Sequence, residues 1–181
     1  MNRLLAAFGA SVCLIVPNLV ATAQVPNRQS ELKKLDGFVG TWNFEWDMKA
    51  SVFGPAGKVL GVERFQWLPG NTYLQLNREG KGPAGEFRHT ILFGYDSVAK
   101  RLMGEFFDLT QGGATSATYT SPNGKVWNWA GTGRTGTGTA YQERCTVTLG
   151  ANNTSSTMTC EVSTDGKGWS LFLTSRATKS T

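Results

Sequence analysis

The sequence has few of the residues that enzymes and metalloproteins use for chemistry. Its 181 residues include one histidine, His89, and three cysteines. A single histidine beside so few cysteines leaves no spacing typical of a zinc site, so we expect no metal. No serine lies in a nucleophile-elbow sequence, which argues against a hydrolase triad. The sequence therefore predicts no cofactor, leaves any catalytic residues unknown and weighs against an enzyme.

Long apolar runs are also missing. The most apolar stretch, residues 4–17, follows Arg3 and precedes Ala-Thr-Ala at 21–23. It is shorter than the roughly 20 residues that span a membrane, and the rest of the sequence predicts no transmembrane segment. A positive start, a short apolar centre and a small-x-small site are typical of a secretory signal peptide. We therefore predict that residues 1–23 are removed on export and that residues 24–181 form a domain in the periplasm or outside the cell.

Charge of one sign is not concentrated anywhere in the chain. The formal net charge is +5, and basic residues are adjacent only at 33–34 and 100–101. A protein that binds nucleic acid needs lysine and arginine gathered on one face. The sequence therefore predicts no nucleic-acid partner.

Two cysteines remain after the predicted cleavage, Cys145 and Cys160. An even count in an exported protein favours a disulfide, and two free thiols are the alternative. Asn152 and Asn153 can form a two-residue hairpin turn, because asparagine tolerates positive φ. Counted outward from that turn, the two cysteines lie directly opposite each other, as a hydrogen-bonded cross-strand pair.

Most of the remaining chain alternates between apolar and polar residues. Trp42, Phe44 and Trp46 alternate with polar residues, and similar short stretches recur between turns such as Ser-Pro-Asn-Gly at 121–124. A period of two indicates half-buried strands, and only residues 29–36 look helical. About ten such strands at short, regular spacing predict an all-β fold, a single antiparallel barrel of about 8–10 strands with a short N-terminal helix.

One stretch imitates a nucleotide-binding motif. Residues 131–136 read Gly-Thr-Gly-Arg-Thr-Gly, which matches Gly-x-Gly-x-x-Gly. That motif needs a parallel strand before it and a helix after it, and the glycine- and threonine-rich residues that follow start no helix. We expect a flexible loop here and no dinucleotide.

Four short motifs give the chain a resemblance to a known family. They are Gly-Thr-Trp at 40–42, Phe-Gln-Trp-Leu-Pro-Gly-Asn-Thr-Tyr-Leu at 65–74, Phe-Gly-Tyr-Asp at 93–96 and Ser-Thr-Asp-Gly-Lys-Gly-Trp at 163–169. Their order is similar to that in small, often exported bacterial lipocalin-like (calycin) proteins of unknown function, which carry an N-terminal Gly-x-Trp. The family usually has a second glycine where this chain has Asn71.

The resemblance implies structural roles for Gly40, Trp42 and Arg176. In such barrels the tryptophan after the first glycine closes the base, and its indole N–H needs a partner there. A basic side chain near the last strand packs across the ring by a cation–π contact, and Arg176 holds the matching position. The alternative for Arg176 is simple exposure to solvent. No catalytic residue comes with the resemblance.

Aromatic residues are abundant, with 6 Trp, 4 Tyr and 10 Phe. This is more than a small barrel needs to plug its ends, and it suits a cavity that binds a small, mostly apolar molecule. The strand that contains His89 is predicted to line this cavity. The full set of predicted ligand-binding residues is Phe65, Phe87, His89, Phe93, Tyr95 and Phe106.

Two other functions are open from the sequence. An enzyme would use the same cavity with His89 or Tyr95 as acid–base groups, whereas a filled barrel would serve structure or interactions in the cell envelope. His89 itself is either a packed residue or a haem ligand, as in a related barrel family with a single histidine. Glu63, Glu86 and Glu105 are single acids on strands, and the sequence does not fix whether any two of them pair. The ligand's identity and the oligomeric state are open as well.

Overall fold

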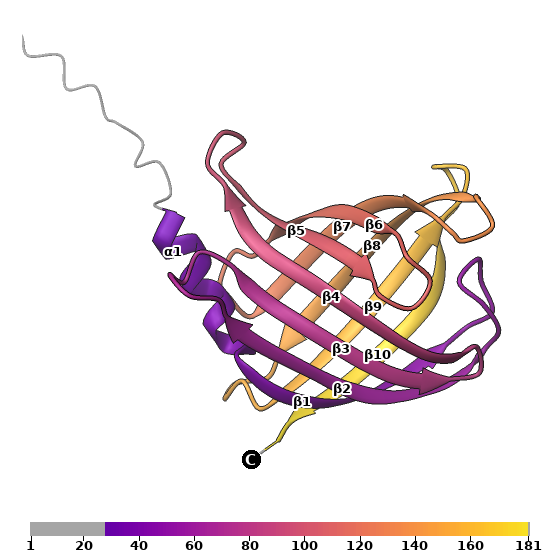
Figure 1. The fold of residues 1–181 in the computed structure, drawn as a ribbon, viewed down its shortest axis with the longest axis horizontal. Coiled ribbons are helices and arrows are strands. Elements are labelled where there is room, and N and C mark those ends of the chain that lie inside the picture. Colours follow the sequence, from indigo (N-terminus) through magenta and orange to yellow (C-terminus); the bar gives the residue numbers. More distant parts are fainter. Residues whose placement is uncertain (1–27, 181) are drawn as a thin grey trace, which may run out of the picture.

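The structure of the protein, a computed structural model, describes residues 28–180, and the predicted signal peptide lies outside that part of the chain. Antiparallel strands form one closed barrel (Figure 1). Because β1 pairs with both β2 and β10, the sheet has no free edge. This confirms the predicted all-β fold of a single antiparallel barrel. In chain order the strands are β1 (Gly40–Met48), β2 (Gly57–Trp67), β3 (Leu74–Gly82), β4 (Gly85–Asp96), β5 (Arg101–Asp108), β6 (Ala114–Thr120), β7 (Val126–Arg134), β8 (Ala140–Leu149), β9 (Ser155–Ser163) and β10 (Ser170–Lys179).

The alternating sequence pattern sets which side chains fill the barrel. In β1, Trp42, Phe44 and Trp46 are buried, whereas Asn43 and Glu45 are exposed. Successive side chains of a strand point to opposite faces, so a period of two places one set inside and the other in solvent. The same alternation in the other strands builds the interior in which the candidate site lies.

The N-terminal segment covers one end of the barrel. It comprises the helix α1 (Arg28–Lys33) and the 3-10 helix η1 (Lys34–Phe38), close to the helical stretch predicted from the sequence. Leu32 and Leu35 are buried in this segment and belong to the hydrophobic core. Figure 1 shows α1 at one end of the barrel and the loop between β1 and β2 at the other. The helical segment therefore closes one end and leaves the other end to the loops.

Trp42 lies at the closed end, as the resemblance implies. Its side chain is 1% exposed, and its indole Nε1–H donates to the carbonyl of Phe38 at 2.7 Å. Gly40 has a φ of 127°, a backbone conformation that glycine adopts readily. The cation over the ring is Lys179, whose Nζ lies 4.9 Å from the ring centroid. The prediction of Arg176 is wrong, because both of its neighbours on β10 point inward and its own side chain is exposed outside.

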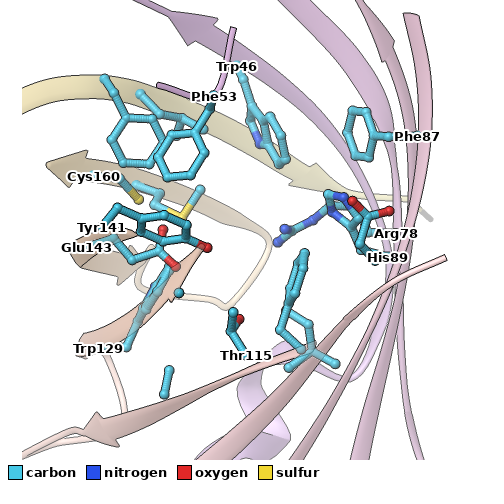
Figure 2. Close-up of a pocket in the computed structure, with 18 of the residues that line it drawn as sticks. Trp46, Phe53, Arg78, Phe87, His89, Thr115, Trp129, Tyr141, Glu143 and Cys160 are labelled. Atoms are coloured by element: carbon cyan, nitrogen blue, oxygen red, sulfur yellow. The ribbon is translucent and has the colours of Figure 1, made fainter. Parts of the chain in front are cut away.

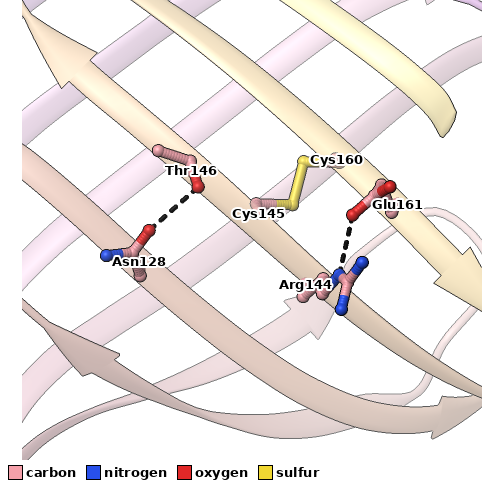
Figure 3. Close-up of a disulfide and its surroundings, with 6 residues drawn as sticks. All are labelled: Asn128, Arg144, Cys145, Thr146, Cys160 and Glu161. Atoms are coloured by element: carbon pink, nitrogen blue, oxygen red, sulfur yellow. Dashed lines mark hydrogen bonds and ion pairs between the residues drawn. A yellow bond between two sulfur atoms is a disulfide. The ribbon is translucent and has the colours of Figure 1, made fainter. Parts of the chain in front are cut away.

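Cys145 and Cys160 form the predicted disulfide between β8 and β9. They are register partners, and their Cα atoms are 4.1 Å apart. Figure 3 shows two polar contacts on the neighbouring residues, an ion pair from Arg144 to Glu161 and a hydrogen bond from Thr146 to Asn128. Both cysteines are buried, so the bridge lies on the inner side of the barrel wall.

The hairpin between these strands differs from the predicted one. The N–H of Gly150 donates to the carbonyl of Ser155 at 2.8 Å, so four residues lie in the loop instead of two. Asn153 has a φ of 55°, as an asparagine in a turn can adopt. The longer loop keeps the predicted partners but reverses the alternation of ladder hydrogen bonds. The cysteines therefore form a non-hydrogen-bonded pair, for which a short Cα separation is typical.

Removal of the disulfide should lower stability without changing the fold. A Cys145→Ala/Cys160→Ala variant is expected to lose about 3 kcal/mol of unfolding free energy, because the bridge restricts a loop of about 15 residues in the unfolded chain. Urea unfolding with and without a reductant measures the effect. The reductant should lower the midpoint of the wild type and leave that of the variant unchanged. Equal midpoints for both proteins without reductant would contradict the prediction.

The glycine-rich stretch at 131–136 is not a flexible loop. Its first four residues complete β7, and a tight turn follows in which the N–H of Gly138 donates to the carbonyl of Thr135 at 2.8 Å. A Cβ on Gly133 would lie 2.6 Å from the hydroxyl oxygen of Tyr141. Gly133 therefore lets an aromatic side chain of β8 lie close against the backbone, which corrects the expectation drawn from the sequence.

Candidate ligand-binding cavity

The barrel encloses a cavity of about 1610 Å³ (Figure 2). At the closed end it is bounded by Leu35, Phe38 and Trp42, and at the other end by loop residues that include Phe53 and Pro83. Ligand pockets commonly measure about 300–1,000 Å³, so this cavity has room for a sizeable molecule. The barrel is therefore not filled by its own side chains.

The structure brings most of the predicted ligand-binding residues together in the cavity wall. Five of the six, Phe65, Phe87, His89, Phe93 and Phe106, line it. The sixth, Tyr95, shares their face of β4 but packs against the hydrophobic core and is not among the lining residues. The binding role of this set stays a prediction. The wall also contains aromatic residues that this set omitted, namely Trp46, Phe53, Tyr119, Trp127, Trp129, Tyr141 and Phe172.

One wall carries a row of aromatic rings in contact with one another. The ring centroids of Trp46 and Phe87 are 5.4 Å apart, and those of Phe87 and His89 are 4.7 Å apart. The rings of β1 and β4 meet because the two strands between them present Gly61 and Gly80, which are register partners. A Cβ on Gly80 would lie 2.7 Å from the ring of Phe87. These two glycines therefore leave room for aromatic rings to lie close against the backbone.

A row of polar side chains crosses the same wall. Glu63, Arg78, His89 and Asp108 are successive register partners on β2, β3, β4 and β5. Arg78 Nε donates to Glu63 Oε1 at 2.7 Å, and both side chains are largely buried. The Arg78 guanidinium also lies 5.0 Å from the centroid of the Trp46 ring. The cation of this wall therefore already has a carboxylate and an aromatic partner.

His89 is neutral at ordinary pH. Burial, with a smaller contribution from the Arg78 guanidinium, lowers the pKa of His89 to about 4, against an opposing effect of Asp108. Two buried side-chain nitrogens within residues 28–180 lack a hydrogen-bond partner. They are the Nδ1 of His89 and the Nε1 of Trp46. This wall can therefore offer hydrogen bonds to a ligand, but His89 offers no charge.

The opposite wall carries an acid, Glu143 on β8. Figure 2 places Glu143 with Tyr141 and Trp129, across the cavity from Arg78 and His89. Burial raises the pKa of Glu143 to about 7, against a smaller opposing effect of Arg78. Burial also raises the pKa of Tyr141 to about 12, so its hydroxyl stays protonated.

Arg78 and Glu143 were missed by the predictions from sequence. Arg78 stands in phase with the buried Leu74 and Leu76, and Glu143 stands in phase with Tyr141 and Cys145. In each case the signal was available, because a charged residue occupied an inward position of an alternating strand. Reading polar residues as outward-facing hid both of them.

The chain matches one known family over most of its length. Residues 27–179 match a family described as "Protein of unknown function (DUF1579)". The chain belongs to the DUF1579 family. The match includes all four motifs that give the sequence its resemblance to lipocalin-like proteins of unknown function. Whether Gly40-x-Trp42 marks DUF1579 proteins in general stays a prediction.

Solved structures resemble this DUF1579 protein in fold. The S-type phycobiliprotein lyase CPES from Guillardia theta has a TM-score of 0.50 and 10% identity, over 85% of this chain and 97% of the lyase. A structure of EF1p2_mFAP2b bound to DFHBI has a TM-score of 0.45 and 11% identity, over 83% of this chain and 100% of that chain. A de novo designed fluorescence-activating β-barrel has a TM-score of 0.40 and 10% identity, over 79% of this chain and 94% of the designed chain. At such identities the lyase supports the barrel fold alone, and the lower scores add no argument.

Neither a curated relative, a membrane-spanning helix nor a metal cluster of residues 28–180 suggests a function for the cavity. A search of curated proteins finds no match to this DUF1579 chain. No helix within residues 28–180 has the length and hydropathy of a bilayer-spanning segment. In the same part of the chain, no three residues among His, Cys, Asp and Glu are grouped as ligands for a metal ion.

Proposed function

We propose that this protein binds a small, mostly apolar molecule inside its barrel. The observation that carries the proposal is the cavity of about 1610 Å³, open toward the loops, whose lining includes many aromatic and aliphatic side chains. Large apolar pockets with a few convergent polar groups are the usual sites for small molecules. Its size argues against a filled barrel that serves structure alone. For an enzyme, Tyr95 is poorly placed, because it does not line the cavity.

Filling part of the cavity should weaken binding. Thr115 points into the cavity (Figure 2), so Thr115→Trp is expected to weaken binding of the neutral fluorescent probe N-phenylnaphthylamine by about tenfold or more, because an indole takes up the space. Fluorescence titration measures the affinity, and a urea melt verifies that the variant is folded.

The matched control is Thr120→Trp on the same strand. Thr120 is exposed, so an indole there should leave probe affinity unchanged within about twofold. Equal affinities for all three proteins would place the probe outside the cavity and overturn the proposal. Native mass spectrometry of protein purified from its own host would then show whether any ligand is retained.

We further propose that the protein acts outside the cytoplasm, in the periplasm or after secretion. The apolar run that ends in Ala-Thr-Ala supports export, and the Cys145–Cys160 disulfide suits an oxidising compartment. Intact-mass analysis of the protein from its own host is expected to give a chain that begins at Gln24. A chain that retains residues 1–23 would contradict this.

A further inference from the structure

Small residues leave a niche beside Glu143 in the cavity wall. The register partner of Glu143 on β7 is Gly131, and the partner of Gly131 on β6 is Ala117. A Cβ on Gly131 would already lie 3.3 Å from the Cβ of Ala117, so no side chain rises between Glu143 and β6. The carboxylate therefore stands at the side of a shallow space whose floor is backbone and one methyl group.

Aromatic rings flank this space on both sides. The row next to Glu143 contains Trp129 and Tyr119, whose ring centroids are 6.0 Å apart and whose ring planes are inclined by 28°. On the other side lies Tyr141, two residues before Glu143 on the same face of β8. Figure 2 shows Tyr141, Glu143 and Trp129 gathered on one wall of the cavity. The space thus has aromatic sides and a carboxylate.

Glu143 has no counter-charge of its own. Among the hydrogen bonds and ion pairs within residues 28–180, none involves its carboxylate, whereas Arg78 across the cavity is paired with Glu63. Tyr119 and Tyr141 face it as neutral hydroxyls, since burial raises the pKa of both. A desolvated carboxylate without a partner is costly to keep charged, so a ligand group with a positive charge would stabilise its ionised form.

Aromatic faces beside a carboxylate favour an organic cation. A ring attracts a cation over its face, and the ammonium–carboxylate hydrogen bond is among the stronger ones. We propose that this niche binds the ammonium group of an amine whose apolar body occupies the rest of the barrel. The niche comprises Ala117, Tyr119, Trp129, Gly131, Tyr141 and Glu143. The inference rests on the proposed function and narrows its ligand to an amine-bearing apolar molecule.

Three ligands of one shape test this inference. Naphthylmethylamine, naphthylmethanol and naphthoate share a ring system and differ in charge, and isothermal titration calorimetry gives their affinities for the full mature chain. At about pH 8 the amine is expected to bind about tenfold or more tightly than the alcohol, and naphthoate most weakly. Glu143→Gln should remove the preference for the amine over the alcohol, because the amide of glutamine carries no charge.

The matched control is Glu161→Gln. Glu161 lies on the neighbouring strand β9, and its carboxylate pairs with Arg144 on the outer face. This change removes the same charge from the protein, so it should leave the amine-to-alcohol ratio unchanged. A ratio that persists in Glu143→Gln, or naphthoate binding as tightly as the amine, would overturn the inference and leave the proposed function intact. Failure of all three to bind would overturn both.

The pH dependence provides a second measurement. Between about pH 5.5 and 8, His89 stays neutral, and Tyr119 and Tyr141 stay protonated, so Glu143 is the group among these four that changes charge. Amine affinity should therefore fall about tenfold from about pH 8 to about pH 5.5, because the carboxylate must first lose a proton. The alcohol should show no such change. An amine affinity that does not depend on pH would contradict the niche.

Discussion

Replacing Trp42 by alanine is expected to lower the unfolding free energy by about 3–5 kcal/mol. The side chain is 1% exposed, and its indole N–H donates to the carbonyl of Phe38. The change would leave a cavity at the closed end and remove the link between η1 and β1. Domains of this size are typically stable by about 5–15 kcal/mol, so much of the stability would be lost. Urea unfolding followed by far-ultraviolet circular dichroism measures the loss.

Trp169→Ala is the matched control for this prediction. Trp169 is another tryptophan, but it lies against the Arg144 guanidinium, with 4.2 Å between the guanidinium carbon and the ring centroid. Trp169 is partly exposed, so its truncation should lower the unfolding free energy by less, about 1 kcal/mol. If the two variants unfold at the same urea concentration, Trp42 does not hold the closed end of the barrel together.

The second large effect concerns the pH dependence of stability. The pKa of Glu143 is raised from 4.5 to about 7 in the folded protein, so between these values the folded state holds a proton that the unfolded state has lost. Stability from this group therefore falls as pH rises through that window. His89 acts in the opposite direction, because its pKa is lowered from 6.5 to about 4. The unfolded chain takes up the extra proton there, so stability falls as pH decreases.

Single substitutions should separate these opposing effects. Relative to the wild type, the unfolding free energy of Glu143→Gln is expected to rise by about 1–3 kcal/mol as pH rises from about 4.5 to 8, because the variant lacks the buried acid. The unfolding free energy of His89→Gln is expected to rise by a similar amount, relative to the wild type, as pH falls from about 7 to 4. Urea unfolding at several pH values gives the differences.

The exposed Glu161→Gln serves again as the control, because its carboxylate lies outside the barrel. Its difference from the wild type should vary little with pH. Differences that are flat with pH for Glu143→Gln and His89→Gln would mean that neither side chain is desolvated in the folded protein.

Much of the barrel could be predicted from the sequence because strand alternation and turn residues act locally. The Cys145–Cys160 partnership was predicted correctly although the loop was not, since many loop lengths centred on the same point give the same partners. Loop length depends on hydrogen bonds near Asn153 that the sequence does not fix. Cross-strand partners are therefore easier to predict than whether a pair is hydrogen-bonded or non-hydrogen-bonded.

The cavity wall could be predicted only in part. Phe87, His89 and Phe93 follow from alternation on one strand, and they do line the cavity. The opposition of Arg78 and Glu143 depends on how strands far apart in sequence come around the barrel, which no local pattern encodes. The choice of Lys179 over Arg176 above Trp42 likewise depends on the phase of the last strand. Long-range placement, more than residue type, limited the prediction of the site.

The closed ring of strands has a consequence for how fast a ligand can exchange. Since each strand is paired on both sides, the wall cannot part without breaking ladder hydrogen bonds, and the helical segment blocks one end. A bound molecule can then leave only past the loops that follow β1, β3, β5, β7 and β9. We therefore expect the motion of these loops to set the residence time of a ligand and contacts with the wall to set its affinity. Changes in the loops should therefore alter association and dissociation rates together and leave the equilibrium nearly untouched.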